Sequence, residues 1–210
     1  MSTAIAQMDP PREEQFISPP PPKPAPAKLT WQQAEKLAAG RPYELINGRM
    51  IFKMPDNKHS DTHGLLCGLL FAYFKGNPIG RVRPEYMLHL WPEKPHEGRM
   101  PDLSVILNES LREESYGSRA PDLAIEIVSP NDTWSELFEK ARLYLAKGSR
   151  VVWIVDSEEQ AVMVITTNDR LWVKDTLTCP ELLPGFSVPV QEIFVWPSTP
   201  AGKSEATASK

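Results

Sequence analysis

The distribution of apolar and polar residues along the chain predicts alternating helices and strands. Thr30 is a suitable N-cap for a short helix, WQQAEKLA, that ends at Gly40. The segment YELINGRMIFKM predicts a β-hairpin, because Asn47-Gly48 suits a type I′ turn. From His59 to Lys75, apolar residues recur on one face of a longer helix, which Gly76 and Pro78 close. The first third of the chain therefore predicts a helix, a hairpin and a second helix.

The rest of the chain predicts a sheet with one crossover helix. Between the third and fourth strands lies TWSELFEKARLYLAKG, a helix with Thr133 as N-cap and Gly148 after its end. A helix in this place predicts a right-handed parallel crossover. We expect the α/β (α+β) class, with a mixed central sheet, helices against it and additional hairpins. The expected strand segments are RVRPEYMLHLW, MPDLSVIL, DLAIEIVS, RVVWIVD and the hairpin AVMVITTNDRLWVK, followed by a closing segment ELLPGFSVPVQEIF. Pro84 in the first of them suggests an edge strand or an irregular start.

Composition predicts one folded domain, residues 29–196, between two disordered arms. Residues 1–28 include SPPPPKPAPA, which favours extended polyproline II and cannot build a core. Residues 197–210 are small and polar. The proline-rich arm is expected to be a solvated tail, with a contact to a partner protein as the alternative.

Charge and cysteine content narrow the function classes. The formal net charge of −4 argues against a high-affinity, non-specific nucleic-acid binder, although an enzyme site can attract DNA locally. Two cysteines give neither a disulfide framework nor a zinc-knuckle spacing. No apolar run approaches the roughly 18 residues of a membrane span, and no signal-peptide pattern is present. We expect a cytoplasmic protein without membrane contact.

Glu126 stands in the middle of an apolar strand, DLAIEIVS. A buried carboxylate normally finds a cation, a metal or a proton, and pairing with a buried arginine is the simplest alternative. Asp122 lies four residues earlier on the same strand, roughly 13 Å away at about 3.3 Å per residue, too far to share an ion. Asp102 begins the preceding strand, and neighbouring strands lie only about 5 Å apart. Asp102 and Glu126 can therefore hold one hard divalent ion, Mg²⁺ or Mn²⁺.

The crossover helix offers a cation for such a site. Glu136, Lys140 and Tyr144 follow each other at helical spacing, toward the border of the helix's apolar face. A long lysine side chain can extend from this border over the sheet edge. The alternative is a surface Glu136–Lys140 pair, worth about 0.3–0.5 kcal/mol.

Two further candidates lie earlier in the chain. His59 and His63 are four residues apart, but HSDTH lacks the glutamate of HExxH and a third ligand, which argues against zinc. Glu44, in the predicted hairpin, fits either a surface or a site position. Glycine-rich phosphate loops, GxSxG elbows and dinucleotide fingerprints are absent from the sequence.

The ordered set of motifs resembles the Uma2 family of restriction-endonuclease-like proteins, within the PD-(D/E)XK nuclease superfamily. The set is YELINGRM, a His-led helix, RMPDLSVI, APDLAIEIVSPND, EKARLYLAKG and VVWIVD. The resemblance covers roughly residues 31–194. It implies Asp102 as the aspartate of the PD motif and Glu126 as the acidic residue of (D/E)XK. The lysine position two residues later is Val128, so the resemblance implies that Lys140, on the following helix, supplies the lysine.

By the same resemblance, Glu44, His63 and Tyr144 fall on recurrent family positions, and Glu136 stands where an aspartate is common. The implied function is a Mg²⁺- or Mn²⁺-dependent endonuclease that hydrolyses DNA, with Asp102, Glu126 and Lys140 as its catalytic residues. A homodimer is expected, because duplex DNA has two strands. The alternative is a catalytically inactive nuclease-like fold that serves as a binding or assembly module.

Overall fold

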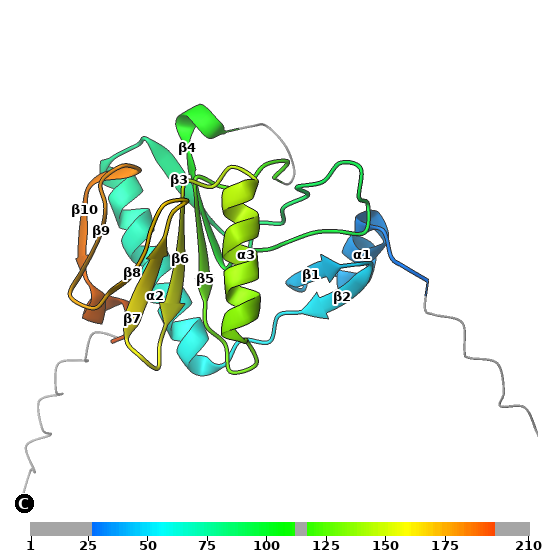
Figure 1. The fold of residues 1–210 in the computed structure, drawn as a ribbon, viewed down its shortest axis with the longest axis horizontal. Coiled ribbons are helices and arrows are strands. Elements are labelled where there is room, and N and C mark those ends of the chain that lie inside the picture. The colour runs from blue at the N-terminus through cyan, green and yellow to red at the C-terminus, as the bar shows by residue number, and fades with distance from the viewer. Residues whose placement is uncertain (1–26, 112–116, 196–210) are drawn as a thin grey trace, which may run out of the picture.

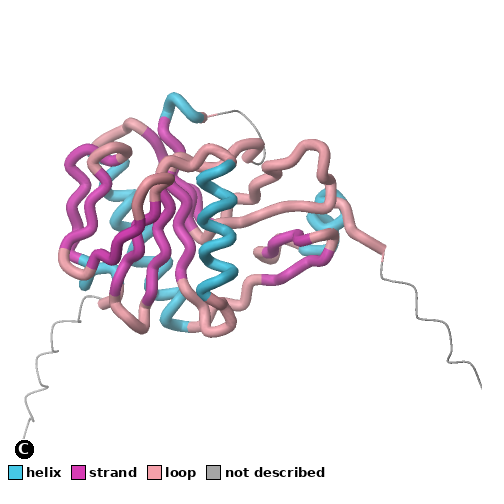
Figure 2. Tube along the Cα trace, viewed as in Figure 1, coloured by secondary structure: helices cyan, strands magenta, loops and turns pink. Residues whose placement is uncertain are grey.

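The computed structural model describes residues 27–111 and 117–195. The predicted C-terminal tail and nearly all of the predicted proline-rich arm, including any partner contact of that arm, lie outside these residues. Within them, the α/β (α+β) class is confirmed: helices flank a mixed six-stranded sheet, and two hairpins are added to it (Figures 1 and 2).

The central sheet has the strand order β3-β4-β5-β6-β7-β8. Only β5 and β6 pair in parallel, and the helix α3 (Trp134–Ala146) connects them, as the predicted crossover requires. All other neighbours in this sheet are antiparallel. The strands are β3 (Gly80–Pro84), β4 (Leu103–Leu107), β5 (Leu123–Ile127), β6 (Val151–Asp156), β7 (Ala161–Ile165) and β8 (Arg170–Val173).

The two long helices cover opposite faces of this sheet (Figure 1). The helix α2 (Asn57–Gly76) packs on the face to which Ile125 and Ile127 of β5 point. The helix α3 packs on the other face, over Ala124. Both faces are covered, so the five residues of β5 are all buried and lack the alternation of a half-exposed strand. Glu126 alternates with Ile125 and Ile127 and therefore points to the face that α3 covers.

A small unit lies beside α3 and leads into α2 (Figure 1). It consists of α1 (Trp31–Ala38) and the antiparallel hairpin of β1 (Tyr43–Ile46) and β2 (Arg49–Phe52). Asn47 and Gly48 have φ values of 52° and 78°, which confirms the predicted type I′ turn. The hairpin is joined to the rest of the molecule by backbone hydrogen bonds between Leu45 and Gly98.

Two strand predictions differ from the structure. The strand expected over residues 81–91 ends at Pro84, which has no N–H for the ladder, and Glu85 then turns the chain with a φ of 46°. Past this point the chain is irregular up to β4. An unexpected strand, β9 (Thr176–Cys179), pairs with β10 (Leu183–Pro189), and this second hairpin packs on the same sheet face as α2.

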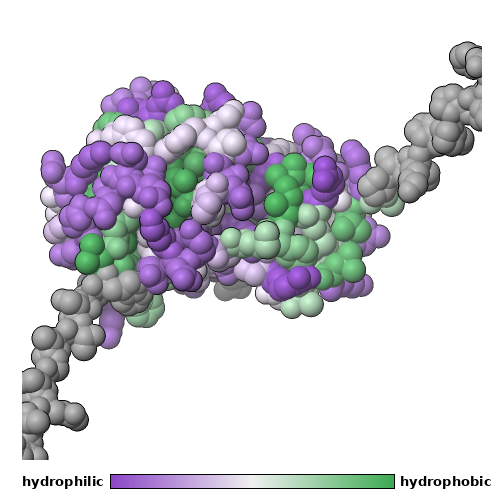
Figure 3. All heavy atoms as spheres, turned by 90° about the horizontal axis from the view of Figure 1, so that it is seen from below, coloured by the Kyte–Doolittle hydropathy of each residue, from purple (hydrophilic) through white to green (hydrophobic). Residues whose placement is uncertain are grey.

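On the face that Figure 3 shows, hydrophilic residues predominate, and apolar groups are prominent toward the end that holds α1 and the β1–β2 hairpin. Exposed apolar side chains of this region include Leu37, Ile51 and Met54. None of the helices in the described part of the chain is long and apolar enough to span a membrane.

Candidate active site

Asp102 and Glu126 lie on neighbouring strands, at the edge of the sheet face that α3 covers. Asp102 directly precedes β4, and the antiparallel register pairs Leu103 with Ile125. This register brings Asp102 to the end of β5, where its Oδ2 accepts a 2.7 Å hydrogen bond from the backbone N–H of Ile127. Both carboxylates are only 3% exposed. The backbone of β5 thus fixes one oxygen of Asp102 beside Glu126.

The β1–β2 hairpin brings a third buried carboxylate, Glu44, to the same place. Glu44 is 5% exposed, and its Oε1 accepts a 3.2 Å hydrogen bond from the N–H of Met100. Its Oε2 lies 3.1 Å from Lys140 Nζ. Three carboxylates from three separate segments of the chain therefore converge.

The helix α3 supplies two side chains to these carboxylates. Lys140 Nζ lies 3.1 Å from Glu126 Oε2, so one ammonium group bridges Glu126 and Glu44. One helical turn later, the hydroxyl of Tyr144 donates a 2.7 Å hydrogen bond to Glu126 Oε1. Tyr144 is completely buried, farther inside than the border position expected from the sequence. The i, i+4 spacing of Lys140 and Tyr144 lets them hold the two oxygens of one carboxylate.

A second lysine, which the sequence analysis did not identify, pairs with Asp102. Lys53 follows β2 in the short segment before α2, and its Nζ lies 2.6 Å from Asp102 Oδ1. His59 Nε2, in the first turn of α2, lies 3.3 Å from Asp102 Oδ2. The sequence offers little indication of Lys53. It is a single lysine directly after the second strand of the hairpin, and no motif of a functional site surrounds it.

His63 lies one turn after His59 and touches the backbone of the same aspartate. Its Nε2 is 3.0 Å from the carbonyl oxygen of Asp102, and its ring stacks on that of His59 with 6.4 Å between centroids. His59 and His63 thus both border Asp102, one through the carboxylate and one through the backbone.

The charges of this cluster act strongly on the pKa values of the carboxylates. Burial opposes ionisation of Asp102, but the charge of Lys53 and the contact with His59 outweigh burial and hold the pKa of Asp102 well below its usual range. Burial raises the pKa of Glu126, and Lys140 and Lys53 oppose this effect without cancelling it. Asp102 is the better neutralised of the two carboxylates.

The partners of Glu126 and Asp102 respond in the same way. Burial would lower the pKa of Lys140, yet the charges of Glu126 and Glu44 prevail and raise it. Burial would also lower the pKa of Lys53, but the charges of Asp102 and Glu126 prevail and raise it. Both lysines are therefore ammonium groups at neutral pH. Burial, followed by the charge of Glu126, raises the pKa of Tyr144, which remains a hydroxyl donor.

The acidic residue at the start of α3 lies away from this cluster. Glu136 forms a capping box with Thr133 at the start of α3, where Thr133 Oγ1 and Glu136 Oε2 are 2.7 Å apart. The alternative considered for Lys140, a surface pair with Glu136, is not formed, since Lys140 contacts Glu44 and Glu126 instead. Val128, where the sequence resemblance implied a missing lysine, is half-buried and packs with the apolar core under α3.

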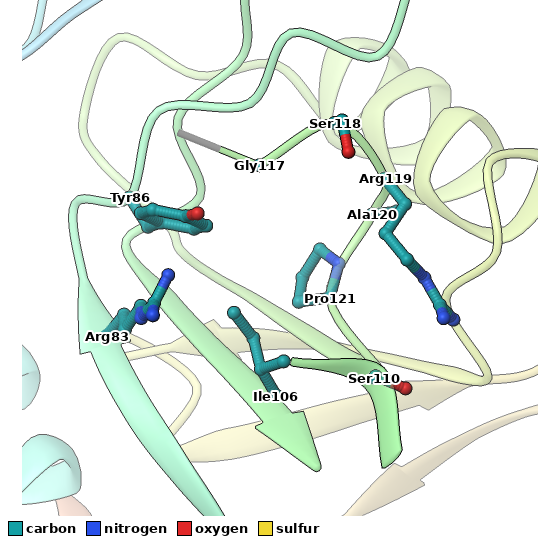
Figure 4. A pocket seen from close by; sticks show the side chains of 9 residues that line it. All are labelled: Arg83, Tyr86, Ile106, Ser110, Gly117, Ser118, Arg119, Ala120 and Pro121. Atoms are coloured by element: carbon teal, nitrogen blue, oxygen red, sulfur yellow. The ribbon is translucent and has the colours of Figure 1, made fainter. Parts of the chain in front are cut away.

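Asp122 has a structural environment. Its two oxygens accept 2.8 Å hydrogen bonds from the N–H of Leu107 and the hydroxyl of Ser110. Ser110 and Arg119, which lies 3.9 Å from Asp122, also line a shallow hollow beside β3 and β4 (Figure 4). None of the three clustered carboxylates lines that hollow. Asp122 therefore ties the ends of β4 and β5 together, some distance from Glu126.

The cluster has a donor set that suits a hard divalent cation. Glu44, Asp102 and Glu126 offer carboxylate oxygens, the ligands that Mg²⁺ and Mn²⁺ prefer, and they carry one more negative charge than Lys53 and Lys140 neutralise. In the part of the chain that the structure describes, no three His, Cys, Asp or Glu side chains are arranged as a metal cage. The three carboxylates are chemically suitable ligands for a metal ion. In this arrangement, Lys53 and Lys140 occupy oxygens that a metal would bind.

Comparison with known proteins gives the family. The model of the Uma2 family, described as "putative restriction endonuclease", matches residues 31–191. The chain belongs to the Uma2 family. No curated protein matches the chain significantly.

One solved structure agrees with this family at the level of the fold. The Uma2 chain is similar to a crystal structure described as a "putative nuclease belonging to DUF820" from Anabaena variabilis, with a TM-score of 0.65 and 23% sequence identity. This match covers 79% of the chain and 97% of that structure, and it confirms the nuclease-like fold. A weaker match is the cryo-electron microscopy structure of a DrdV–DNA complex, with a TM-score of 0.38, 13% identity, and coverage of 66% of this chain and 11% of that one.

Proposed function

We propose that this Uma2 protein is a metal-dependent endonuclease that hydrolyses phosphodiester bonds of DNA. One observation carries the proposal: Glu44, Asp102 and Glu126 converge with two lysines at the end of β5, in a chain whose family is described as a restriction endonuclease. Buried carboxylates are costly unless they serve an interaction, and sites that bind metal and phosphate need such groups.

Asp102 and Glu126 would hold the metal, Mg²⁺ or Mn²⁺, with Glu44 beside them. A bound divalent ion would supply Lewis acidity toward the scissile phosphate and lower the pKa of a coordinated water. The chain's part is to orient the ligands. The Ile127 N–H positions Asp102, and the Tyr144 hydroxyl positions Glu126.

Lys140 would be the catalytic cation. In the reaction, a water oxygen attacks phosphorus, the bond from phosphorus to the 3′ oxygen breaks, and a water proton ends on that 3′ oxygen. The products are a 5′ phosphate and a 3′ hydroxyl. Because Lys140 is an ammonium group, it orients the water and stabilises the negative charge that develops on the phosphate oxygens. His63 lines the site beside Asp102.

DNA is the proposed substrate because the family is described as "putative restriction endonuclease", and cations gather around Trp91 despite the net charge of −4. Lys94, Arg99 and Lys147 lie 5.9, 5.4 and 5.1 Å from the ring centre of Trp91. Arg99 also donates to the carbonyl of Leu45, next to the catalytic cluster. Local positive charge of this kind attracts the phosphate backbone.

A homodimer is part of the proposal, since two sites in one assembly can cut both strands of a duplex in a single binding event. Light scattering after size-exclusion chromatography measures the mass directly: about twice the 23.6 kDa of one chain is expected, and a monomer with and without DNA contradicts this part.

The second candidate is an inactive nuclease-like module that binds or assembles without cutting. It is favoured by the ion pairs themselves, because Lys53 and Lys140 already hold oxygens of all three carboxylates. A melting temperature that Mg²⁺ leaves unchanged would support this candidate, whereas an intact metal site raises it.

Plasmid cleavage tests the proposed function. Supercoiled DNA is incubated with Mg²⁺ or with EDTA, using the wild type, Asp102→Ala, Glu126→Gln and Lys140→Ala. The wild type should give nicked and linear products with Mg²⁺ and none with EDTA. Each variant should show a large loss of cleavage activity. Equal cleavage by all four proteins, or cleavage in EDTA, would contradict the site assignment. RNA of the same sequence serves as the substrate control.

A further inference from the structure

The two lysines of the candidate site are held very differently. Lys140 lies in the middle of α3, between helical turns on either side. Lys53 lies in the irregular segment between the end of β2 and the start of α2, next to Met54, which is 78% exposed. The ammonium group of Lys53 pairs with one carboxylate, Asp102, whereas that of Lys140 pairs with both Glu44 and Glu126. Lys53 is therefore the more easily moved cation.

The oxygens of Asp102 are also unequal. Oδ2 is fixed by the backbone N–H of Ile127 and by His59. Oδ1 is held at 2.6 Å by Lys53, whose side chain is 16% exposed, close to the 19% of Lys140. A divalent ion that binds Asp102 must approach this ammonium group, and two cations a few ångströms apart repel each other strongly in a partly buried site.

We propose that Lys53 is a displaceable counter-cation, which occupies Asp102 Oδ1 until a divalent metal replaces it. This inference rests on the proposed function, because it assumes that Asp102 is a metal ligand. It explains how the chain tolerates the buried carboxylate of Asp102 without a metal. It also implies that the phosphates of bound DNA promote metal binding, since they offer Lys53 a new anionic partner.

Metal affinity without any substrate tests this proposal. Binding of Mn²⁺ is measured by electron paramagnetic resonance in the wild type, Lys53→Met and Lys58→Met. Lys53→Met should bind Mn²⁺ at least about tenfold more tightly, because its competitor is gone. Lys58→Met is the matched control: Lys58 is an exposed lysine near the same helix start, and it pairs with Glu158. Its Mn²⁺ affinity should stay within about twofold of the wild type.

Equal or weaker Mn²⁺ binding by Lys53→Met overturns the proposal. If that variant does not fold without metal, Lys53→Arg decides the question. Its guanidinium keeps the positive charge and can hold both the carboxylate and solvent, so Mn²⁺ binding should be no tighter than in the wild type. Tighter binding by Lys53→Arg would contradict competition by charge.

Binding of DNA provides a second test. A phosphorothioate duplex that resists hydrolysis should tighten Mn²⁺ binding in the wild type, and tighten it less in Lys53→Met. An equal effect in both contradicts the implied release of Lys53 to phosphate. Failure of the two proposals is distinguishable. Tighter Mn²⁺ binding by Lys53→Met without plasmid cleavage removes the nuclease function alone, and cleavage without the affinity change removes only the role of Lys53.

Discussion

Lys140 Nζ lies 3.1 Å from Glu126 Oε2, although the two residues belong to different layers of the fold. Glu126 lies in the sheet and Lys140 on the helix that crosses over it. Val128, directly after β5, is where the family resemblance leads us to expect a lysine on the strand side, and it packs into the core instead. A lysine from the helix therefore reaches the carboxylate that a lysine from the strand would otherwise approach.

Asp102→Asn should destabilise the protein by about 3–5 kcal/mol at neutral pH, because Lys53 loses its buried counter-charge. The folded pKa of Asp102 is lowered, so its stabilisation is present above about pH 4 and is lost as pH falls further. Urea unfolding at several pH values measures this. The gap between wild type and variant should narrow below about pH 4, and a gap that widens there would contradict the pairing.

Glu126→Gln should show the opposite trend. The folded pKa of Glu126 is raised, so stability is greatest with its proton bound, below about pH 4, and falls as pH rises through the raised pKa. Glutamine cannot ionise and still offers an oxygen to Tyr144. The stability of Glu126→Gln relative to wild type should therefore rise between about pH 4 and 8 in the same urea series. A relative decline would show that Glu126 is stabilised as an anion.

Tyr144→Phe should keep the packing under α3 and remove one buried donor to Glu126. The expected cost is about 1 kcal/mol of unfolding free energy, with cleavage slowed about tenfold because Glu126 is less firmly oriented. Single-turnover cleavage at saturating metal separates the two effects. A stability loss with an unchanged cleavage rate would make Tyr144 a structural residue only.

Asp122→Ala provides the matched comparison with Asp102→Ala, because each aspartate follows a proline and precedes a strand. Loss of the Asp122 oxygens leaves the Leu107 N–H without its partner and should cost about 1–3 kcal/mol. Cleavage per folded molecule should remain at the wild-type level. Loss of cleavage in well-folded Asp122→Ala would place Asp122 in the reaction.

Glu136→Ala tests whether the acidic residue at the helix start contributes to catalysis. Its side chain caps α3 through Thr133 and is absent from the carboxylate cluster. We expect a slightly lower melting temperature and a cleavage rate within about twofold of wild type. A cleavage defect that Glu136→Asp restores would assign Glu136 a role at the site.

The sequence was sufficient for the strand pairing that places Asp102 beside Glu126. A carboxylate inside an apolar strand and a second one at the start of the preceding strand can meet only if the strands are neighbours, which the register of Leu103 and Ile125 confirms. The crossover helix and the Asn47-Gly48 turn followed from local signals in the same way. Each of these features depends on a local signal or on strands that follow each other in the chain.

The remaining features depend on contacts between distant segments. Lys53 lies 49 residues from Asp102, and the pattern RMIFKMPD does not show which side of the hairpin faces the sheet. Glu44 was undecided for the same reason. The segment after Pro84 was expected to continue as a strand, because its apolar residues suit one. The missing proline N–H and the positive φ of Glu85 end the ladder instead.

Anomalous diffraction from crystals soaked in Mn²⁺ tests the central claim most directly, because it locates the metal without relying on activity. The account predicts a peak within about 2.5 Å of oxygens from both Asp102 and Glu126, with Lys53 moved away from Asp102 Oδ1. A peak at other residues, or no peak at this cluster at a Mn²⁺ concentration that saturates binding in solution, would contradict it.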